Sequence, residues 1–429
     1  MKLLGRGQDP AFWTGLKENR VFDRYIKELR EYWQSEGNSF VIETLPYSKW
    51  KLFWETGDRS QYEALYFKRR RFIEHVLPLS LIYPDESVYV DKDALVYGGI
   101  YAENAENIHI FGNGVFDDSS EMRLDGSSCY EPFTNGNFKL YDCKNVTVNG
   151  VGFCNSAGWC VGFFHCFDIE LDGINVFGQW RYNTDGIDIV NSQRITVRNS
   201  FVHSFDDGIT LKGIDRYCFE CCADILVENC VLWCDWGHTL EIGYETHCPE
   251  YRNVTFRNCD ILRGGATVCN IQNGDCAYVH DIRYEDIRIE WERFYTEDVI
   301  QTTDEEVYDK KGSLQLSNVF SIVNHRFRDG YRDVLPQLNN VPPYVRAEGS
   351  PEFAGVERVI AKDIRIYCDE KIFDRCAENE VVFVRVFNHI ETSQYADITI
   401  ENVSVNGKRL TKDEMRVVTK GKIERFQII

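Results

Sequence analysis

Three aspartates lie within residues 183–212, which read NTDGIDIVNSQRITVRNSFVHSFDDGITLK. Asp185 directly precedes a glycine, and so does the adjacent pair Asp206 and Asp207. A further strand-like segment follows His238, in the sequence GHTLEIG. Carboxyl groups and an imidazole on neighbouring strands suit general acid and base catalysis on a polar substrate.

The elements that would position these residues form a loose repeat. From about residue 88 onward, a polar residue is followed by an apolar-polar-apolar run, and these units begin at Asn107, Asn145, Asp168, Arg194, Asp224, Asn253 and Asp281, then again at Asp363 and Asp397. Between residues 145 and 281 the units start 23 to 30 residues apart. Such a period indicates a repeat architecture whose stacked units share one core.

Each unit is too short to contain a crossover helix, which disfavours a barrel of alternating strands and helices. Hairpin signals are sparse, which disfavours an antiparallel sandwich. The sequence therefore predicts an all-β fold, a right-handed parallel β-helix. Residues placed at the same point of successive coils would then form ladders on one face.

The predicted β-helix catalytic domain covers residues 86–429, and residues 1–85 differ from it. Apolar residues at three- and four-residue steps predict one amphipathic helix over residues 22–33 and a second over 62–76. These helices would form an N-terminal helical cap over one end of the stack. Residues 296–357 break the repeat and predict a long insertion, either a functional loop or lid or an ordinary surface loop.

Composition narrows the function classes. The formal net charge of −20 disfavours nucleic acid and anionic membranes as partners. No apolar run reaches the length of about 18 residues that a membrane span needs. The N-terminus lacks a signal-peptide apolar region, so a cytoplasmic location is expected. The sixteen cysteines are then expected to be reduced, and Cys218, Cys221 and Cys222 are expected to pack in a loop rather than bind zinc.

Crowding gives the three aspartates a chemical role. Carboxylates close together repel one another, so at least one pKa should rise. A protonated carboxyl beside ionised neighbours is what cleavage of a glycosidic bond requires. As single residues, Asp185 and Asp207 also fit Asp-Gly corners between coils, and His238 also fits a buried hydrogen-bonded histidine.

The set NTDGID, DDGITLK and GHTLEIG resembles the polygalacturonase family, glycoside hydrolase family 28. The resemblance covers roughly residues 100–290 and implies a parallel β-helix and hydrolysis with inversion at the anomeric carbon. By this resemblance Asp206 matches the general acid, Asp185 and Asp207 match the acids that hold and deprotonate water, and His238 supports the acid. It implies an oligosaccharide substrate and no metal or cofactor.

One departure from the family concerns substrate binding. The family's Arg-Ile-Lys motif, which binds the galacturonate carboxylate, is replaced here by Asn270, Ile271 and Gln272. Neutral carboxamides bond sugar hydroxyls but give no charge-assisted bond to a carboxylate. Glu241 would repel a uronate, whereas Lys212 and the arginines of the 325–332 loop could restore a cation. We therefore expect a neutral or unusual pectic oligosaccharide as the substrate. We also expect exo action, because long insertions such as residues 296–357 tend to block a groove.

Other functions stay open at this point. A polygalacturonase acting on galacturonan oligosaccharides is the nearest alternative. A lyase or epimerase on the same scaffold would require a calcium-binding cluster of acids together with an Arg or Lys base. A non-catalytic carbohydrate-binding β-helix would not require three acids in this arrangement. The sequence also leaves open whether the chain forms a homo-oligomer.

Overall fold

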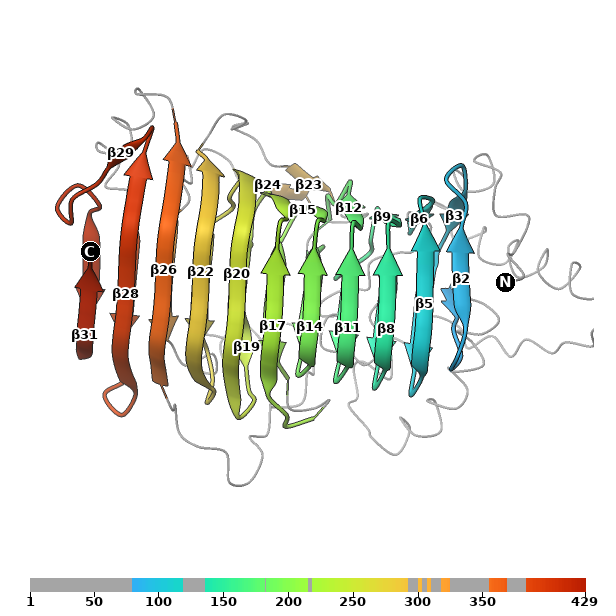
Figure 1. Ribbon diagram of the computed structural model, residues 1–429, viewed down its shortest axis with the longest axis horizontal. Helices are drawn as coiled ribbons and strands as arrows, with labels where there is room; N and C mark the ends of the chain where they lie inside the picture. The colour runs from blue at the N-terminus through green and yellow to red at the C-terminus, as the bar shows by residue number, and fades with distance from the viewer. Residues whose placement is uncertain are drawn as a thin grey trace, which may run out of the picture.

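The chain winds into a parallel β-helix. The computed structural model describes residues 79–118, 136–181, 183–214, 218–291, 300–302, 307–309, 318–324, 355–368 and 383–429. In Figure 1 the strands nearest the viewer point upward while successive coils advance from right to left, so the winding is right-handed. The predicted all-β, parallel β-helix class is confirmed.

One long sheet takes a single strand from each of eleven coils within the described residues. We call it the site sheet because the candidate site lies on it. Its strands, in spatial order, are β1 (Leu79–Leu81), β4 (Gly99–Glu103), β7 (Phe138–Tyr141), β10 (Val161–Phe164), β13 (Ile187–Val190), β16 (Ile209–Gly213), β19 (His238–Thr246), β21 (Thr267–Asn273), β25 (Asn318–Asn324), β27 (Val384–Asn388) and β30 (Val417–Lys420).

The second sheet contains the remaining strands of the coils, and we call it the back sheet. Its early coils use two short strands each: β2 (Ser87–Val90) and β3 (Leu95–Tyr97), β5 (Glu106–Gly112) and β6 (Val115–Asp117), β8 (Lys144–Asn149) and β9 (Gly152–Cys154), β11 (Phe167–Asp172) and β12 (Asn175–Phe177), β14 (Gln193–Arg198) and β15 (Phe201–Ser204), β17 (Cys222–Glu228) and β18 (Val231–Cys234). Later coils merge them into β20 (Glu250–Arg263), β22 (Tyr278–Glu290), β26 (Gly355–Tyr367), β28 (Gln394–Val405) and β31 (Ile423–Ile428), with the short antiparallel β29 (Lys408–Arg409).

The core lies between the two sheets. Each unit of the repeat places its first apolar residue in register with that of the next coil, as in Val146, Ile169 and Ile195. The row continues through Ile225 and Val254, and all five side chains are at most 2% exposed. Each coil thus covers the apolar face of its neighbour, which no single coil could bury alone.

The backbone conformation explains why a polar residue begins each unit. Asn145, Asp168, Arg194 and Asp224 all have φ between 54° and 59°, the left-handed region that Asn and Asp tolerate better than most residues. In the coil of β26, Arg358 occupies this corner. Its neighbour Val359 pairs with Ile282 and Ile398, the first apolar residues of the adjoining units, and Arg358 itself has a positive φ.

The prediction that a unit of the repeat begins at Asp363 is therefore wrong. Asp363 lies at a second left-handed corner in the middle of β26, where its carboxylate accepts a hydrogen bond from Asn402 of the next coil. Asn258 and Asp286 occupy the same corner in preceding coils. Two corners per coil share one residue preference, so the sequence pattern alone does not separate them.

The boundaries differ in part from those expected. The predicted N-terminal helices lie outside the described residues, and the β-helix already includes β1 at Leu79–Leu81. Within the predicted insertion, β23 (Ile300–Thr302) and β24 (Val307–Asp309) form an antiparallel pair, while β25 joins the site sheet. Nowhere in the described ranges is a helix long and apolar enough to cross a membrane.

The second corner of the back sheet offers a test of fold energetics. Asn229 has a φ of 56°; its side chain donates to Asn199 at 3.3 Å and accepts from Asn258 at 2.6 Å. We expect Asn229→Ala to lower the free energy of unfolding by about 2 kcal/mol, through left-handed strain and lost hydrogen bonds. Asn229→Gly should lose less, because glycine adopts this φ freely. Urea unfolding of both variants measures the difference, and an equal or larger loss for glycine would contradict the explanation.

Candidate active site

The predicted catalytic residues lie at one corner of three successive coils, each just before or at the start of a strand of the site sheet. Asp185 precedes β13, Asp206 and Asp207 precede β16, and His238 opens β19. Backbone bonds fix their register: Gly186 N–H donates to Asp207 O at 2.8 Å, and Gly208 N–H donates to His238 O at 2.7 Å. The structure thus brings together the residues that the sequence separates by up to 53 positions.

Glycines in the motifs allow this close stacking. A Cβ at Gly237 would lie 2.5 Å from the Oδ1 atom of Asp206, and one at Gly208 would lie 2.4 Å from the carbonyl oxygen of Thr239. Either contact is closer than a real Cβ atom tolerates. The glycine before His238 and the glycine after Asp207 are therefore required by the approach of neighbouring coils.

Lys212 is the positive centre of the site. Its Nζ atom lies 3.7 Å from Asp185 Oδ2, 3.3 Å from Asp207 Oδ2 and 3.3 Å from Glu245 Oε2, and the residue is 3% exposed. Burial alone would lower the pKa of Lys212, but the surrounding carboxylates raise it well above its usual value. Lys212 therefore stays charged and is fully engaged by protein acids, which leaves no free cation there for a substrate.

The adjacent Asp206 and Asp207 have opposite protonation preferences. Burial, reinforced by the charge of Asp207, raises the pKa of Asp206 to about 8. Burial also acts to raise the pKa of Asp207, but Lys212, His238 and hydrogen bonds outweigh it and lower that pKa below its usual value. One of those bonds is donated by the backbone N–H of His238 to Asp207 Oδ1 at 2.9 Å. At neutral pH the pair therefore consists of a carboxylic acid beside a carboxylate.

Asp185 belongs to a second pair that the sequence analysis did not single out. Burial, and then the charge of Asp188, raises the pKa of Asp185 well above its usual value, while burial raises the pKa of Asp188 to about 7. Asp188 lies within the NTDGID motif, and alternation along β13 places it on the same outward row as Lys139, with Gly162 between them. Lys139 and Lys212 both favour the charged form of Asp188.

Glu241 lies in this same outward row, next to Asn270. Asn270 Nδ2 donates to Glu241 Oε1 at 3.0 Å, and both residues are buried. Burial, and then the charge of Asp207, raises the pKa of Glu241 well above its usual value. The predicted binding residues Glu241 and Asn270 are therefore partners of each other, and a largely neutral Glu241 repels a uronate less than expected.

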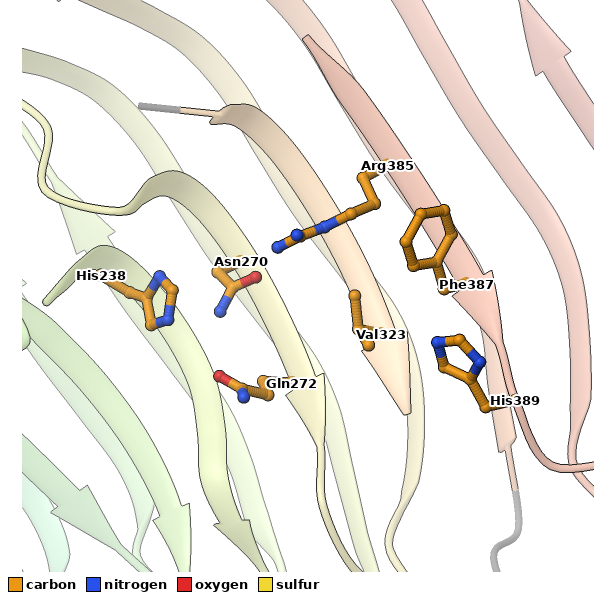
Figure 2. A pocket seen from close by; sticks show the side chains of 7 residues that line it. All are labelled: His238, Asn270, Gln272, Val323, Arg385, Phe387 and His389. Carbon is orange, nitrogen blue, oxygen red and sulfur yellow. The ribbon is translucent and has the colours of Figure 1, made fainter. Parts of the chain in front are cut away.

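A cavity of about 170 Å³ lies on the side of the later coils, and of the predicted catalytic residues His238 is in its lining, whereas Asp185, Asp206 and Asp207 are not. Its lining contains the predicted residues His238, Asn270 and Gln272, together with Val323, Arg385, Phe387 and His389. Figure 2 shows the guanidinium of Arg385 reaching from β27 across β25 toward Asn270. Sequence analysis missed Arg385, which lies more than a hundred residues after Gln272; the loop at 325–332 proposed instead lies outside the described residues.

We also examined whether the side chains could hold a metal ion. In the described part of the chain, no group of three or more histidine, cysteine or acidic side chains is arranged to hold a metal ion. Burial raises the pKa of Cys218 and of Cys222 to about 12, so both are thiols at neutral pH.

The raised pKa of Asp206 predicts a pH-dependent cost in stability. An unfolded Asp loses its proton near pH 4, whereas folded Asp206 keeps it to about pH 8. The folded state binds more protons between these values, so its free energy of unfolding falls as pH rises. We expect Asp206→Asn to gain stability relative to the parent between pH 5 and pH 8.5, on the order of a few kcal/mol, by chemical denaturation.

Asp168→Asn is the matched control for this prediction. The hydrogen bond from Arg194 lowers the pKa of Asp168, so that carboxylate favours folding once ionised. Its loss should give no gain at high pH. A stability difference for Asp206→Asn that does not change with pH would contradict the assigned protonation state.

Comparisons with known proteins agree with this geometry. Residues 89–314, more than half of the chain, match the model of glycosyl hydrolases family 28. The chain is 29% identical over 224 residues to a probable endopolygalacturonase D of Neosartorya fischeri, covering 46% of this chain and 43% of that protein. It is 26% identical over 210 residues to a probable exopolygalacturonase B of Aspergillus fumigatus, covering 43% and 44%. The aligned part thus spans less than half the length of either relative.

Solved structures share the fold. An exopolygalacturonase from Thermotoga maritima superposes with a TM-score of 0.51 at 15% identity, covering 82% of this chain and 81% of that one. Dex49A from Penicillium minioluteum gives a TM-score of 0.50 at 11% identity, covering 76% and 50%. On the match of its family model and the stacked aspartates of its motifs, the chain belongs to glycosyl hydrolase family 28.

Proposed function

We propose that the protein hydrolyses glycosidic bonds of pectin-type oligosaccharides with inversion at the anomeric carbon. The observation that carries this proposal is the stacking of Asp206 and Asp207, whose pKa values shift in opposite directions, against His238, which lines a cavity and whose backbone N–H donates to Asp207. A glycosidase needs an acid for the leaving group and a base for water. Family membership supports the same reaction class.

In the proposed reaction Asp206 is the general acid. It donates its proton to the glycosidic oxygen as the bond between that oxygen and the anomeric carbon breaks. Water attacks the carbon from the opposite face, and Asp207 accepts the proton that the water loses. The products are two shorter sugars, and the enzyme returns to its starting state when Asp207 releases the proton it accepted and Asp206 regains one, so that no net proton is gained or lost.

Asp185 would orient the water rather than deprotonate it. Its pKa is raised, which makes it a weaker candidate for the ionised base than Asp207. Its Oδ1 atom is buried and has no hydrogen-bond partner within the described ranges. A buried acceptor of this kind is costly unless water or substrate satisfies it.

For the substrate class, we give more weight to the names of the relatives than to the carboxamides of Asn270 and Gln272. The two curated relatives are both named as polygalacturonases, and the neutral sugar expected from Asn270 and Gln272 has no support from them. We therefore place galacturonate-containing oligosaccharides first among substrates. The exo mode of action stays a prediction.

Replacement of the acid tests this function. Asp206→Asn should lower kcat on oligogalacturonides by about 10²- to 10⁴-fold, the usual loss for a missing general acid. In the parent enzyme activity should fall about tenfold per pH unit above pH 8, because Asp206 loses its proton there. Reducing-end assays measure both effects, and Asp168→Asn on the back sheet should leave activity unchanged.

The stereochemistry gives an independent readout. Proton NMR of the first product should show the anomer opposite to that of the cleaved bond. Retention of configuration, an unsaturated product detected by its ultraviolet absorbance, or near-normal turnover by Asp206→Asn would each overturn the assignment. Binding without turnover of any oligosaccharide would favour a carbohydrate-binding role.

A further inference from the structure

Arg385 is the permanently charged side chain in the lining of the cavity. The other polar side chains there are two carboxamides, Asn270 and Gln272, and two histidines, His238 and His389. Lys212 lies outside this lining and is surrounded by carboxylates. An anionic ligand in the cavity would therefore find its cation on β27.

The register of the site sheet explains how Arg385 reaches so far. Asn270 pairs with Ser321 on β25, and Ser321 pairs with Arg385 on β27. The middle residue is small and buried, so the arginine side chain lies across it. The Nε atom of Arg385 donates to Ser321 Oγ at 3.2 Å, which directs the guanidinium toward Asn270 (Figure 2).

The guanidinium of Arg385 also differs from other arginines of the coil stack in its partners. On the back sheet, arginines pair with a carboxylate of an adjoining coil, as Arg194 does with Asp168, Arg257 with Glu228 and Arg425 with Asp397. Arg385 forms no ion pair within the described residues. Burial lowers its pKa, as expected for a partly desolvated charge that contacts the neutral hydroxyl of Ser321 rather than a carboxylate.

We propose that Arg385 is a specificity-determining residue that binds the carboxylate of an acidic sugar unit lying beyond His238. The proposal rests on the hydrolase function and deepens it by naming the group that selects a uronate. Arginine forms two parallel hydrogen bonds with a carboxylate. Gln272 and the free acceptor of Asn270 would bond sugar hydroxyls, since Asn270 Nδ2 is held by Glu241.

This arrangement would move the carboxylate-binding function by two coils. The cation at the positions of Asn270 and Gln272 is lost, and a cation from β27 occupies the same cavity. The ring of Phe387, 5.8 Å from the guanidinium carbon of Arg385, would supply an apolar wall for the sugar. The neutral residues at 270 and 272 therefore do not require a neutral substrate.

Binding measurements separate this proposal from catalysis. Calorimetry in the Asp206→Asn background, which should not turn over substrate, compares a galacturonate oligosaccharide with its methyl-esterified form. We expect the acid form to bind more tightly, and Arg385→Gln to weaken it by about 10- to 100-fold. The ester should bind equally well with and without Arg385, and Arg385→Lys should give an intermediate loss confined to the acid form.

Lys420→Gln is the matched control. Lys420 lies 4.6 Å from the ring of Phe387 but outside the cavity lining, so its loss changes the net charge equally and should not alter binding. The proposal is overturned if both sugar forms weaken together, if Lys420→Gln matches Arg385→Gln, or if neither form binds. Thermal unfolding checks each variant, and Arg385→Lys carries the comparison should Arg385→Gln not fold. If the parent enzyme binds the acid form selectively but does not hydrolyse it, the proposed function is wrong and the role of Arg385 in binding stands.

Discussion

The site depends on the competition of several buried carboxylates for one ammonium group. Lys212 contacts Asp185, Asp207 and Glu245 at 3.3–3.7 Å, and it stabilises charge where it is closest. Asp206 is buried to about the same extent as Asp207, but it has no ion pair with Lys212 in the described residues. It also lies directly beside the charge of Asp207. Proton occupancy is therefore divided by position rather than by residue type, which is how one pair of aspartates supplies both an acid and a base.

The β-helix provides the crowding that this division requires. Neighbouring coils are spaced by the hydrogen bonds of parallel strands, about 4.8 Å apart, so side chains at one corner of successive coils are forced into contact. Gly208 and Gly237 remove the Cβ atoms that would hold the coils apart there. The stack is in turn stabilised by its apolar rows and by the left-handed corners occupied by Asn, Asp and sometimes Arg.

Sequence reasoning predicted local features well and long-range ones poorly. The repeat predicted the parallel β-helix, and the three motifs predicted which acids meet, because both depend on residues within one or two coils. Arg385 was missed because the sequence repeat is broken over residues 296–357, between β21 and β27, so that the coils cannot be counted from the sequence there. Two local features were also misread. Asp188 was overlooked although alternation along β13 places it outward, and Asp363 was misplaced because two corners share one residue preference.

The protonation of Asp206 at neutral pH is the claim on which the chemistry depends most. Carbon-13 NMR of the carboxyl carbons of labelled aspartate, assigned by difference from Asp206→Asn, follows that group directly through a pH titration. A resonance of Asp206 that stays in its protonated form at pH 7 and titrates near pH 8 is the expected result. Titration near pH 4, as in an exposed aspartate, would contradict the division of roles between Asp206 and Asp207.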